Sequence, residues 1–524
     1  MTICKLADCL LFCLVVLLLG QAKAQNASPE LFPQGELVFP ASSSPSSTKV
    51  IAIDPAFVSM MRPSELIQGS DASGQKNASL RIPAPVRART NVILFRPAAL
   101  ANPTSGGIFI PSSVATPVDT TADQATRLFE TPQSIACVYG VIPMIGGCDP
   151  NNATLRVTKL SGGQRAIAVV TAYDVPNVKE NFVAFSNYFG LPADGLNIVY
   201  ASASKADSVP ADERGWEIET YLDVEWAHAM APSAKIILVI AKTSSPSDML
   251  AAAAEASKQL RAVGGGEIAM SWTVPLLDFV KATNWGAKQF ELFEQNVFET
   301  GNIVPIAATG DYPLVGYPAS SSRVVAVGGT SLVRGQATNQ FSKEIAWECT
   351  GAGIRPDLPQ PPYQGNIGRN GGRSIADMAA ISDPRRGAMV YVGKVSAPDP
   401  SWVILDDAWM VVGGTSLATP IVAGLVNQSG TFRRSGTEQL TTIYSQKKGA
   451  GNFSDIDTGA CGPMVKQTVD CCDPKNQTNA CCNSKDPKFK SDACTKRDTT
   501  RKFSSKIGWD YCTGVGSPKA FGAF

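Results

Sequence analysis

The stretch Val411-Val-Gly-Gly-Thr-Ser-Leu-Ala-Thr-Pro420 leads through a turn of small residues into the apolar run 421–426. Its two glycines allow a tight backbone path, Thr415 or Ser416 can cap a following helix, and Pro420 is tolerated in the first turn. A serine hydroxyl is therefore expected at a helix N-terminus, where N–H groups and the helix dipole favour developing negative charge. Many ordinary N-cap turns look the same, so this stretch alone favours a structural interpretation.

The histidine content bears on how such a serine could react. A serine nucleophile normally uses an imidazole base, and the chain has a single histidine, His228, in the sequence Ala-His-Ala-Met. This setting lacks flanking glycines and does not favour a Ser-His-Asp triad. A triad built on His228 stays as an alternative interpretation.

The helix predicted over 216–230 offers another base. It has no internal Pro or Gly, and Glu219 and Asp223 are four residues apart, so they share one face. Two adjacent carboxylates share protons, which raises one pKa and leaves a group that can accept a proton in mildly acidic medium. A solvated acidic face explains the spacing equally well. Glu217 and Glu225 fall on other faces.

A third acidic residue follows a predicted buried strand. The run 303–308 is apolar, and Asp311 lies in the turn directly after it. In α/β proteins, ligands and chemistry gather just beyond the carboxyl ends of the strands. The alternative is an Asx turn, a common role for Gly-Asp after a strand.

Together these stretches resemble the sedolisins, the serine-carboxyl peptidases with a subtilisin-like fold. The matching stretches, in order, are Glu219-Thr-Tyr-Leu-Asp223-Val-Glu225, Ala231-Pro-Ser-Ala-Lys-Ile236, Ala308-Thr-Gly-Asp311, Tyr317-Pro-Ala319, Ala326-Val-Gly-Gly-Thr-Ser331 and Gly413-Gly-Thr-Ser416-Leu-Ala-Thr-Pro420. The resemblance runs from about Thr131 to the C-terminus. It implies Ser416 as nucleophile, Glu219 with Asp223 as the base system, and Asp311 in the oxyanion hole. The implied substrate is a protein or peptide, cleaved by an endopeptidase or a tripeptidyl-peptidase.

The sequence departs from the family pattern in two places and repeats the nucleophile motif once. Thr273 stands where the family has a glycine in the substrate cleft, and Tyr312-Pro313 stands for Ser-Gly after the oxyanion-hole aspartate. A second Gly-Gly-Thr-Ser copy ends at Ser331. No apolar helical run follows Ser331, and the resemblance makes that copy structural.

Apolar runs predict buried parallel strands separated by helices. The strands are expected at 166–172, 197–201, 235–241, 267–271, 303–308 and 324–327, and the clearest helices at 247–263 and 287–300. This alternation predicts an α/β fold with a doubly wound, mostly parallel sheet and a small N-terminal β-rich extension.

The N-terminus and the composition predict an exported protein. Residues 1–24 have a basic n-region, a short apolar core and an Ala-Lys-Ala end, as in a cleaved secretory signal. No later stretch is long enough for a membrane span. The 46 basic and 45 acidic residues nearly balance, so the composition gives no excess of positive charge for binding nucleic acid. A monomeric protein is expected, secreted or in an acidic lysosome-like compartment.

Residues 25–130 are rich in Ser, Pro and Ala with short strand-like runs such as 91–95. Sedolisins carry an inhibitory propeptide in this place, so the resemblance implies a zymogen with a pro-region at 25–130 and a peptidase domain at 131–524. An appended β-rich module or linker is the alternative.

The cysteines and sequons suit an oxidising route. Of 13 cysteines three leave with the signal, and the even remainder is consistent with disulfides. Cys137 and Cys148 bracket a short loop and form a natural pair. A cysteine-rich insertion at 461–495 reads as a disulfide-stapled loop, and several Asn-X-Ser/Thr sequons predict a glycoprotein.

Two C-terminal segments resemble the calcium-binding segments of the family. The implied ligands of one structural Ca²⁺ are the Asp455 and Asp510 carboxylates and the carbonyls of Ile456, Lys506 and Gly508, hard oxygen donors of the kind calcium prefers. The altered Thr273 and Tyr312-Pro313, together with the cysteine-rich insertion, motivate the alternative function, a catalytically silent, secreted calcium-binding protein that uses the fold for interaction.

Overall fold

The computed structural model describes most of the chain from residue 129 onward and short parts before it. The described residues are 35–38, 49–51, 68–70, 76–78, 80–82, 86–97, 129–202, 204–283, 287–311, 315–335, 338–367, 371–393, 408–446, 451–461 and 503–524. The predicted signal peptide, Tyr312-Pro313 and the insertion beyond Cys461 lie outside these residues.

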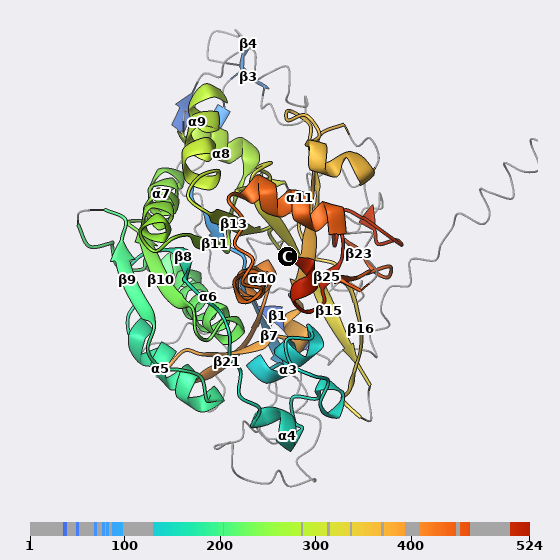
Figure 1. Ribbon diagram of the computed structural model, residues 1–524. Helices are drawn as coiled ribbons and strands as arrows, with labels where there is room; N and C mark the ends of the chain where they lie inside the picture. Colours follow the sequence, from blue (N-terminus) through green and yellow to red (C-terminus); the bar gives the residue numbers. More distant parts are fainter. Residues whose placement is uncertain are drawn as a thin grey trace, which may run out of the picture.

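A mostly parallel sheet of eight strands forms the centre of the fold (Figure 1). Its order is β16 (Phe341–Ala346), β15 (Val325–Arg334), β13 (Ile303–Ala308), β11 (Gly266–Met270), β8 (Ala166–Ala172), β10 (Lys235–Ala241) and β9 (Leu196–Tyr200), with β19 (Met378–Ile381) on β15. Every neighbouring pair is parallel except β15 with β16. The predicted fold class is confirmed.

Helices cover both faces of the sheet because the strand residues are apolar on both sides. Ile167 and Val169 pack in one core with α6 and α10, whereas Ala168 and Val170 pack in a second core with α7. On the first face lie α5 (Val178–Phe189), α6 (Gly215–Met230), α10 (Thr415–Gln428) and α11 (Gly436–Gln446). On the second lie α7 (Pro246–Ala262), α8 (Leu276–Thr283) and α9 (Ala287–Phe298).

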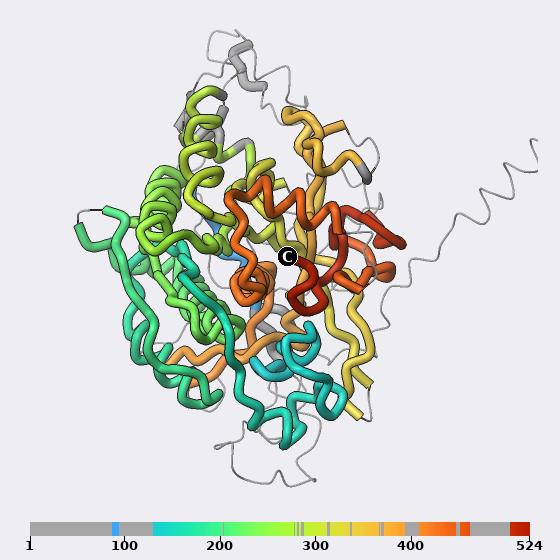
Figure 2. The backbone as a smooth tube through the Cα atoms, viewed as in Figure 1, coloured from blue at the N-terminus to red at the C-terminus, as the bar shows by residue number. Residues whose placement is uncertain are grey.

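Part of the predicted N-terminal extension is built into the fold. A four-stranded sheet has the order β1 (Gly35–Val38), β7 (Ile93–Pro97), β21 (Trp409–Gly413) and β20 (Ala388–Tyr391). A second small sheet joins β14 (Gly316–Tyr317), β12 (Trp272–Pro275) and β6 (Arg89–Thr90). The short blue stretch in Figure 2 therefore runs through the middle of the molecule beside α10. Residues 89–97 therefore pair with strands of the predicted peptidase domain.

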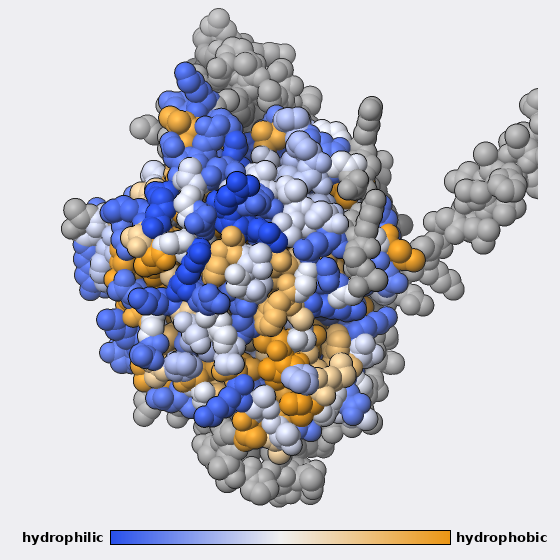
Figure 3. All heavy atoms as spheres, in the orientation of Figure 1, coloured by the Kyte–Doolittle hydropathy of each residue, from blue (hydrophilic) through white to orange (hydrophobic). Residues whose placement is uncertain are grey.

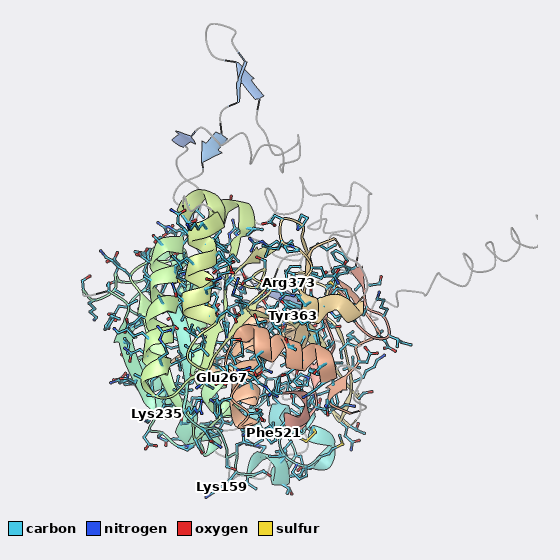
Figure 4. All side chains as sticks on the ribbon, turned by 45° about the horizontal axis from the view of Figure 1, so that its top comes forward. Lys159, Lys235, Glu267, Tyr363, Arg373 and Phe521 are labelled. Atoms are coloured by element: carbon cyan, nitrogen blue, oxygen red, sulfur yellow. A yellow bond between two sulfur atoms is a disulfide. The ribbon has the colours of Figure 1, made fainter. Side chains whose placement is uncertain are left out.

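Smaller elements complete the described chain. They are β2 (Lys49–Ile51) with β5 (Leu80–Ile82), β3 (Gln68–Ser70) with β4 (Lys76–Ala78), β17 (Gly353–Arg355) with β18 (Arg373–Ile375), β22 (Phe453–Ser454) with β25 (Ser517–Pro518), β23 (Ala460–Cys461) with β24 (Phe503–Ser504), and the helices α3 (Pro132–Val138) and α4 (Ala153–Arg156). Arg373 and Tyr363 lie next to each other where β18 meets the helical turn 362–367 (Figure 4).

Two disulfides join described cysteines. The predicted Cys137–Cys148 bond is confirmed. Cys461, predicted to staple the insertion, is instead bonded to Cys512. The pairing of β23 with β24 brings these two cysteines together across 51 residues of sequence, which no local spacing indicates.

The molecular surface is mixed in character. On the face drawn in Figure 3, hydrophilic residues cover α11, and hydrophobic residues gather below it. None of the helices among the described residues combines the length and the apolar character that crossing a bilayer requires.

Candidate active site

The site is built around the N-terminus of α10. Gly414 is its N-cap with φ +105°, and a Cβ at this position would lie 1.9 Å from the Asn91 carbonyl oxygen, so only glycine fits. The expectation that Thr415 or Ser416 caps the helix is wrong, since neither side chain does so. The first N–H groups are instead used by distant residues. The Thr415 N–H donates to Asp311 Oδ1 (2.7 Å), and the Ser416 N–H donates to the Asn91 carbonyl (3.3 Å).

Pro420 also lies deeper in the helix than the sequence analysis predicts. It falls inside α10 rather than in its first turn. A proline there has no N–H to offer to the carbonyl four residues earlier, which is that of Ser416. The Ser271 hydroxyl oxygen lies 3.4 Å from this carbonyl oxygen.

Asp311 follows β13 and reaches the start of α10. Its Oδ1 accepts hydrogen bonds from both the N–H and the hydroxyl of Thr415, while its Oδ2 has no partner among the described residues. Burial raises the pKa of Asp311 to about 8, although the Thr415 hydrogen bonds oppose this. The carboxyl is therefore protonated at acidic pH, and Oδ2 is positioned to be a donor.

Glu219 and Asp223 are 1% and 0% exposed, which excludes the solvated acidic face. The Ser271 hydroxyl donates to Asp223 Oδ1 at 2.6 Å. Burial raises the pKa of both carboxyls well above the ordinary range, and the charge of Asp223 raises that of Glu219 further. Glu225 on the same helix lies elsewhere and accepts a hydrogen bond from the Tyr391 N–H.

Ser416 lies against these carboxyls. It is fully buried, and its hydroxyl donates to the Ser271 carbonyl at 2.9 Å. No hydrogen bond of ordinary geometry reaches either Glu219 oxygen within the described part of the chain, yet the Ser416 side chain is close enough to Glu219 to lower its pKa. The structure thus brings the four predicted catalytic residues together.

The two competing groups lie outside this cluster. Ser331 is within β15, and its hydroxyl donates to Asp383 Oδ2 at 2.6 Å. His228 is on α6, nine residues or about 14 Å along the helix from Glu219. Its ring packs on Phe182, its Nε2 contacts the Pro192 carbonyl at 2.7 Å, and burial lowers its pKa to about 4. A triad built on His228 is not supported by this arrangement.

Comparison with known proteins agrees with the geometry. Kumamolisin of Bacillus sp. (strain MN-32) is 23% identical over 416 residues, which cover 74% of this chain and 62% of kumamolisin. Sedolisin of Pseudomonas sp. (strain 101) is 32% identical over 123 residues, 21% of this chain and 18% of sedolisin. The chain is therefore similar to members of the sedolisin family. No family model matches it.

A solved structure shows the same fold as this chain. It is Pseudomonas sedolisin, described as a serine-carboxyl proteinase complexed with two molecules of pseudo-iodotyrostatin. The TM-score is 0.52 at 18% identity, and the match covers 75% of this chain and 95% of that one. The chain spans less than two thirds of the length of either curated relative.

The two segments predicted to hold calcium lie side by side. The Gly508 N–H donates to Asp455 Oδ2 at 2.8 Å, and Asp510 accepts from the N–H groups of Cys512 and Thr513. Burial raises the pKa of Asp510 to about 6. Within the described ranges, no three His, Cys, Asp or Glu side chains gather as a metal site. A cation here would therefore depend on two carboxylates and backbone carbonyls, the donor set that the sequence predicts.

Two further residues complete the site. Ser271 connects Asp223 with Ser416, and Asn91 lies over Gly414, although the sequence indicates for Asn91 only a strand-like run in the extension. Nothing near Asn91 in the sequence signals this position, because the contact is made across more than 300 residues of chain.

Proposed function

We propose that this protein is a secreted serine-carboxyl peptidase of the sedolisin type that hydrolyses peptide bonds in acidic medium. The observation that carries the proposal is the convergence of Ser416, Glu219, Asp223 and Asp311 in one buried cluster. An alcohol beside a carboxyl pair and a protonated carboxyl beside a helix N-terminus provide a nucleophile, a base and an oxyanion donor. The peptidase relatives support the reaction class.

The reaction is an acyl transfer. The Ser416 oxygen attacks the scissile carbonyl carbon while Glu219 takes the proton of the Ser416 hydroxyl. Asp223 holds Ser416 and Glu219 in place through its hydrogen bond with Ser271. The Ser416 N–H and the protonated Asp311 donate to the oxygen that becomes negative. Glu219 then gives the proton to the leaving amine, and water hydrolyses the ester by the same steps.

Two opposite requirements set the pH range of the reaction. Glu219 must be ionised, and a hydrated glutamate ionises near pH ~4.3. Asp311 must be protonated, and its pKa of about 8 provides this at every lower pH. In the described form burial raises the pKa of both Glu219 and Asp311, so access of solvent to the site would lower both.

An endopeptidase is favoured over a tripeptidyl-peptidase. The segment that contains Asn91 lies over Gly414, and it keeps contacts with the protein more than three residues toward its N-terminus. The Ala88 N–H donates to the Ser244 carbonyl at 2.7 Å, and Arg87 pairs with Glu213. A site that binds a peptide at these positions does not end after the third residue on the N-terminal side of the cleaved bond, as the site of a tripeptidyl-peptidase would.

The test compares Ser416→Ala with Ser331→Ala, its counterpart in the second Gly-Gly-Thr-Ser copy. The purified protein is incubated at pH 4 with a denatured protein substrate. Ser416→Ala is expected to abolish cleavage, and Ser331→Ala to retain it. Full activity in Ser416→Ala would overturn the proposal, and no cleavage by the wild type would favour the silent calcium-binding alternative.

We also propose that one calcium ion stabilises the C-terminal segments. The residues that would hold it are Asp455 and Asp510 with the carbonyls of Ile456, Lys506 and Gly508, and the ion would lower the pKa of buried Asp510. Added CaCl2 is then expected to raise the Tm of the wild type but not of Asp455→Asn. Equal Tm values with CaCl2 and with EDTA would contradict this site.

A further inference from the structure

The segment 87–94 crosses the active site as an added strand. On one side of Asn91, β6 pairs antiparallel with β12 through Thr90 opposite Trp272 and Arg89 opposite Thr273. On the other side, β7 pairs antiparallel with β21 through Ile93 opposite Gly413. A peptide substrate that adds to a sheet edge makes main-chain hydrogen bonds of this kind. The segment therefore occupies the path of a substrate in both directions from Asn91.

The carbonyl of Asn91 lies where the attacked carbonyl must lie. It accepts from the Ser416 N–H at 3.3 Å. The space above Gly414 is bordered by this same oxygen and by Asp311 Oδ2, which are 1.9 and 2.6 Å from the position of a Cβ there. Both donors of the oxyanion site thus surround one carbonyl. The bond that follows this carbonyl joins Asn91 to Val92.

The side chain of Asn91 is recognised through its amide hydrogens. The residue is 2% exposed, and its Nδ2 donates to the Ser271 carbonyl at 3.0 Å and to Thr273 Oγ1 at 2.8 Å. The Thr273 hydroxyl can direct its own hydrogen to the Ala308 carbonyl at 3.4 Å, which leaves its oxygen free to accept. An aspartate or a leucine has no N–H to offer, and a glycine at 273 would have no acceptor.

We propose that this site selects asparagine at the residue whose carbonyl is attacked, with Thr273 as the specificity-determining residue, and that Asn91–Val92 is the bond it presents to Ser416. This inference rests on the proposed peptidase function. In the reaction, the Ser416 oxygen bonds to the Asn91 carbonyl carbon, and the bond to the Val92 nitrogen breaks. The serine proton passes through Glu219 to the Val92 amine. Water then releases Asn91 as a new carboxyl terminus.

The first experiment follows the chain itself. Full-length protein is incubated at pH 4, and its fragments are identified by intact mass and N-terminal sequencing under denaturing conditions. We expect a new N-terminus at Val92 in the wild type, none in Ser416→Ala, and at least a tenfold slower cut in Asn91→Leu. A cut elsewhere that leaves Asn91–Val92 intact, or an equal rate in Asn91→Leu, would overturn the inference.

The second experiment measures specificity with quenched fluorescent peptides. They carry the sequence 87–94 with Asn, Asp or Leu at the position of Asn91, and kcat/KM is measured for the wild type and for Thr273→Val. One lost hydrogen bond to a buried group costs on the order of tenfold. We expect the wild type to favour Asn over Leu by about tenfold or more, and Thr273→Val to lose about tenfold of that preference while still cleaving the Leu peptide.

Failure of the inference is distinguishable from failure of the proposed function. If the wild type cleaves a denatured protein but shows no preference for Asn, or if Thr273→Val keeps the full preference, the specificity inference is wrong and the peptidase function stands. If no substrate is cleaved after the acid incubation, both are overturned.

Discussion

Asp311 is the residue whose protonation state limits the reaction at high pH. Burial raises its pKa to about 8 in the described form, so the donor form persists above the pH at which a hydrated aspartate ionises and is lost at higher pH. Asp311→Asn keeps a donor at every pH, so we expect its kcat/KM to persist above pH 8 where that of the wild type falls. Asp311→Ala should lose about 10²–10³-fold in kcat at all pH values. An identical alkaline limb in the wild type and Asp311→Asn, measured between pH 3 and 9, would contradict this role.

Glu219 and Glu225 allow a matched test on one helix. Both are buried on α6 with a raised pKa, but only Glu219 lies beside Ser416. We expect Glu219→Gln to lower kcat by about 10²–10⁴-fold, the usual contribution of a general base. Glu225→Gln keeps an oxygen for the Tyr391 N–H and should stay within a few-fold of the wild type. Comparable losses in both variants would indicate damage to the helix rather than removal of a base.

At the scale of elements, the contact between α6 and α10 holds the base beside the nucleophile. Gly424 on α10 is the closest approach, since a Cβ there would lie 2.4 Å from Met230 Cβ and 3.1 Å from the Ala227 carbonyl oxygen. Gly424→Ala must push the helices apart, at a cost of about 1–3 kcal/mol that outweighs the gain of up to ~1 kcal/mol in helix propensity. We expect a lower Tm together with a lower kcat. Gly365→Ala, where a Cβ meets open space, is the control and should change neither.

The elements were predictable from the sequence to different degrees. The predicted strand at 166–172 and the helix at 216–230 match the structure to within one residue, because an apolar run or an uninterrupted helical stretch is a local property. The end of β15 was not predictable in this way. The strand continues to Arg334 because it pairs with β16, and that is a contact between strands rather than a local property. The cap of α10 was mispredicted for the same reason, because Asp311 and Asn91 come from distant segments.

At the scale of the whole molecule, the sheet topology explains why the site could be predicted only in part. Asp311 leaves the carboxyl end of β13, and α10 packs across the face of the same sheet, so their meeting follows from the predicted fold class. The position of residues 86–97 does not follow from it. That segment pairs with β12 on one side of Asn91 and with β21 on the other. No local pattern in the sequence of the extension predicts these two pairings.

The buried acids of the molecule predict how its stability depends on pH. Burial raises the pKa of Asp311 and of Glu267 to about 8, and Glu267 keeps this shift although Asn427 and Arg165 oppose it (Figure 4). Between pH ~4, where such groups ionise in an unfolded chain, and about 8, the folded state holds more protons than the unfolded state. The free energy of unfolding should then fall as pH rises, by up to about 1.4 kcal/mol per pH unit for each group.

We therefore expect the Tm of Ser416→Ala, which cannot cleave itself, to be higher at pH 4 than at pH 8. Glu267→Gln in the same background keeps an acceptor for Asn427 but removes the titrating group, so its Tm should change less over this range. A Tm of Ser416→Ala that rises from pH 4 to pH 8 would mean that these carboxyls are ionised in the folded protein. The oxyanion role of Asp311 would then have no proton to donate.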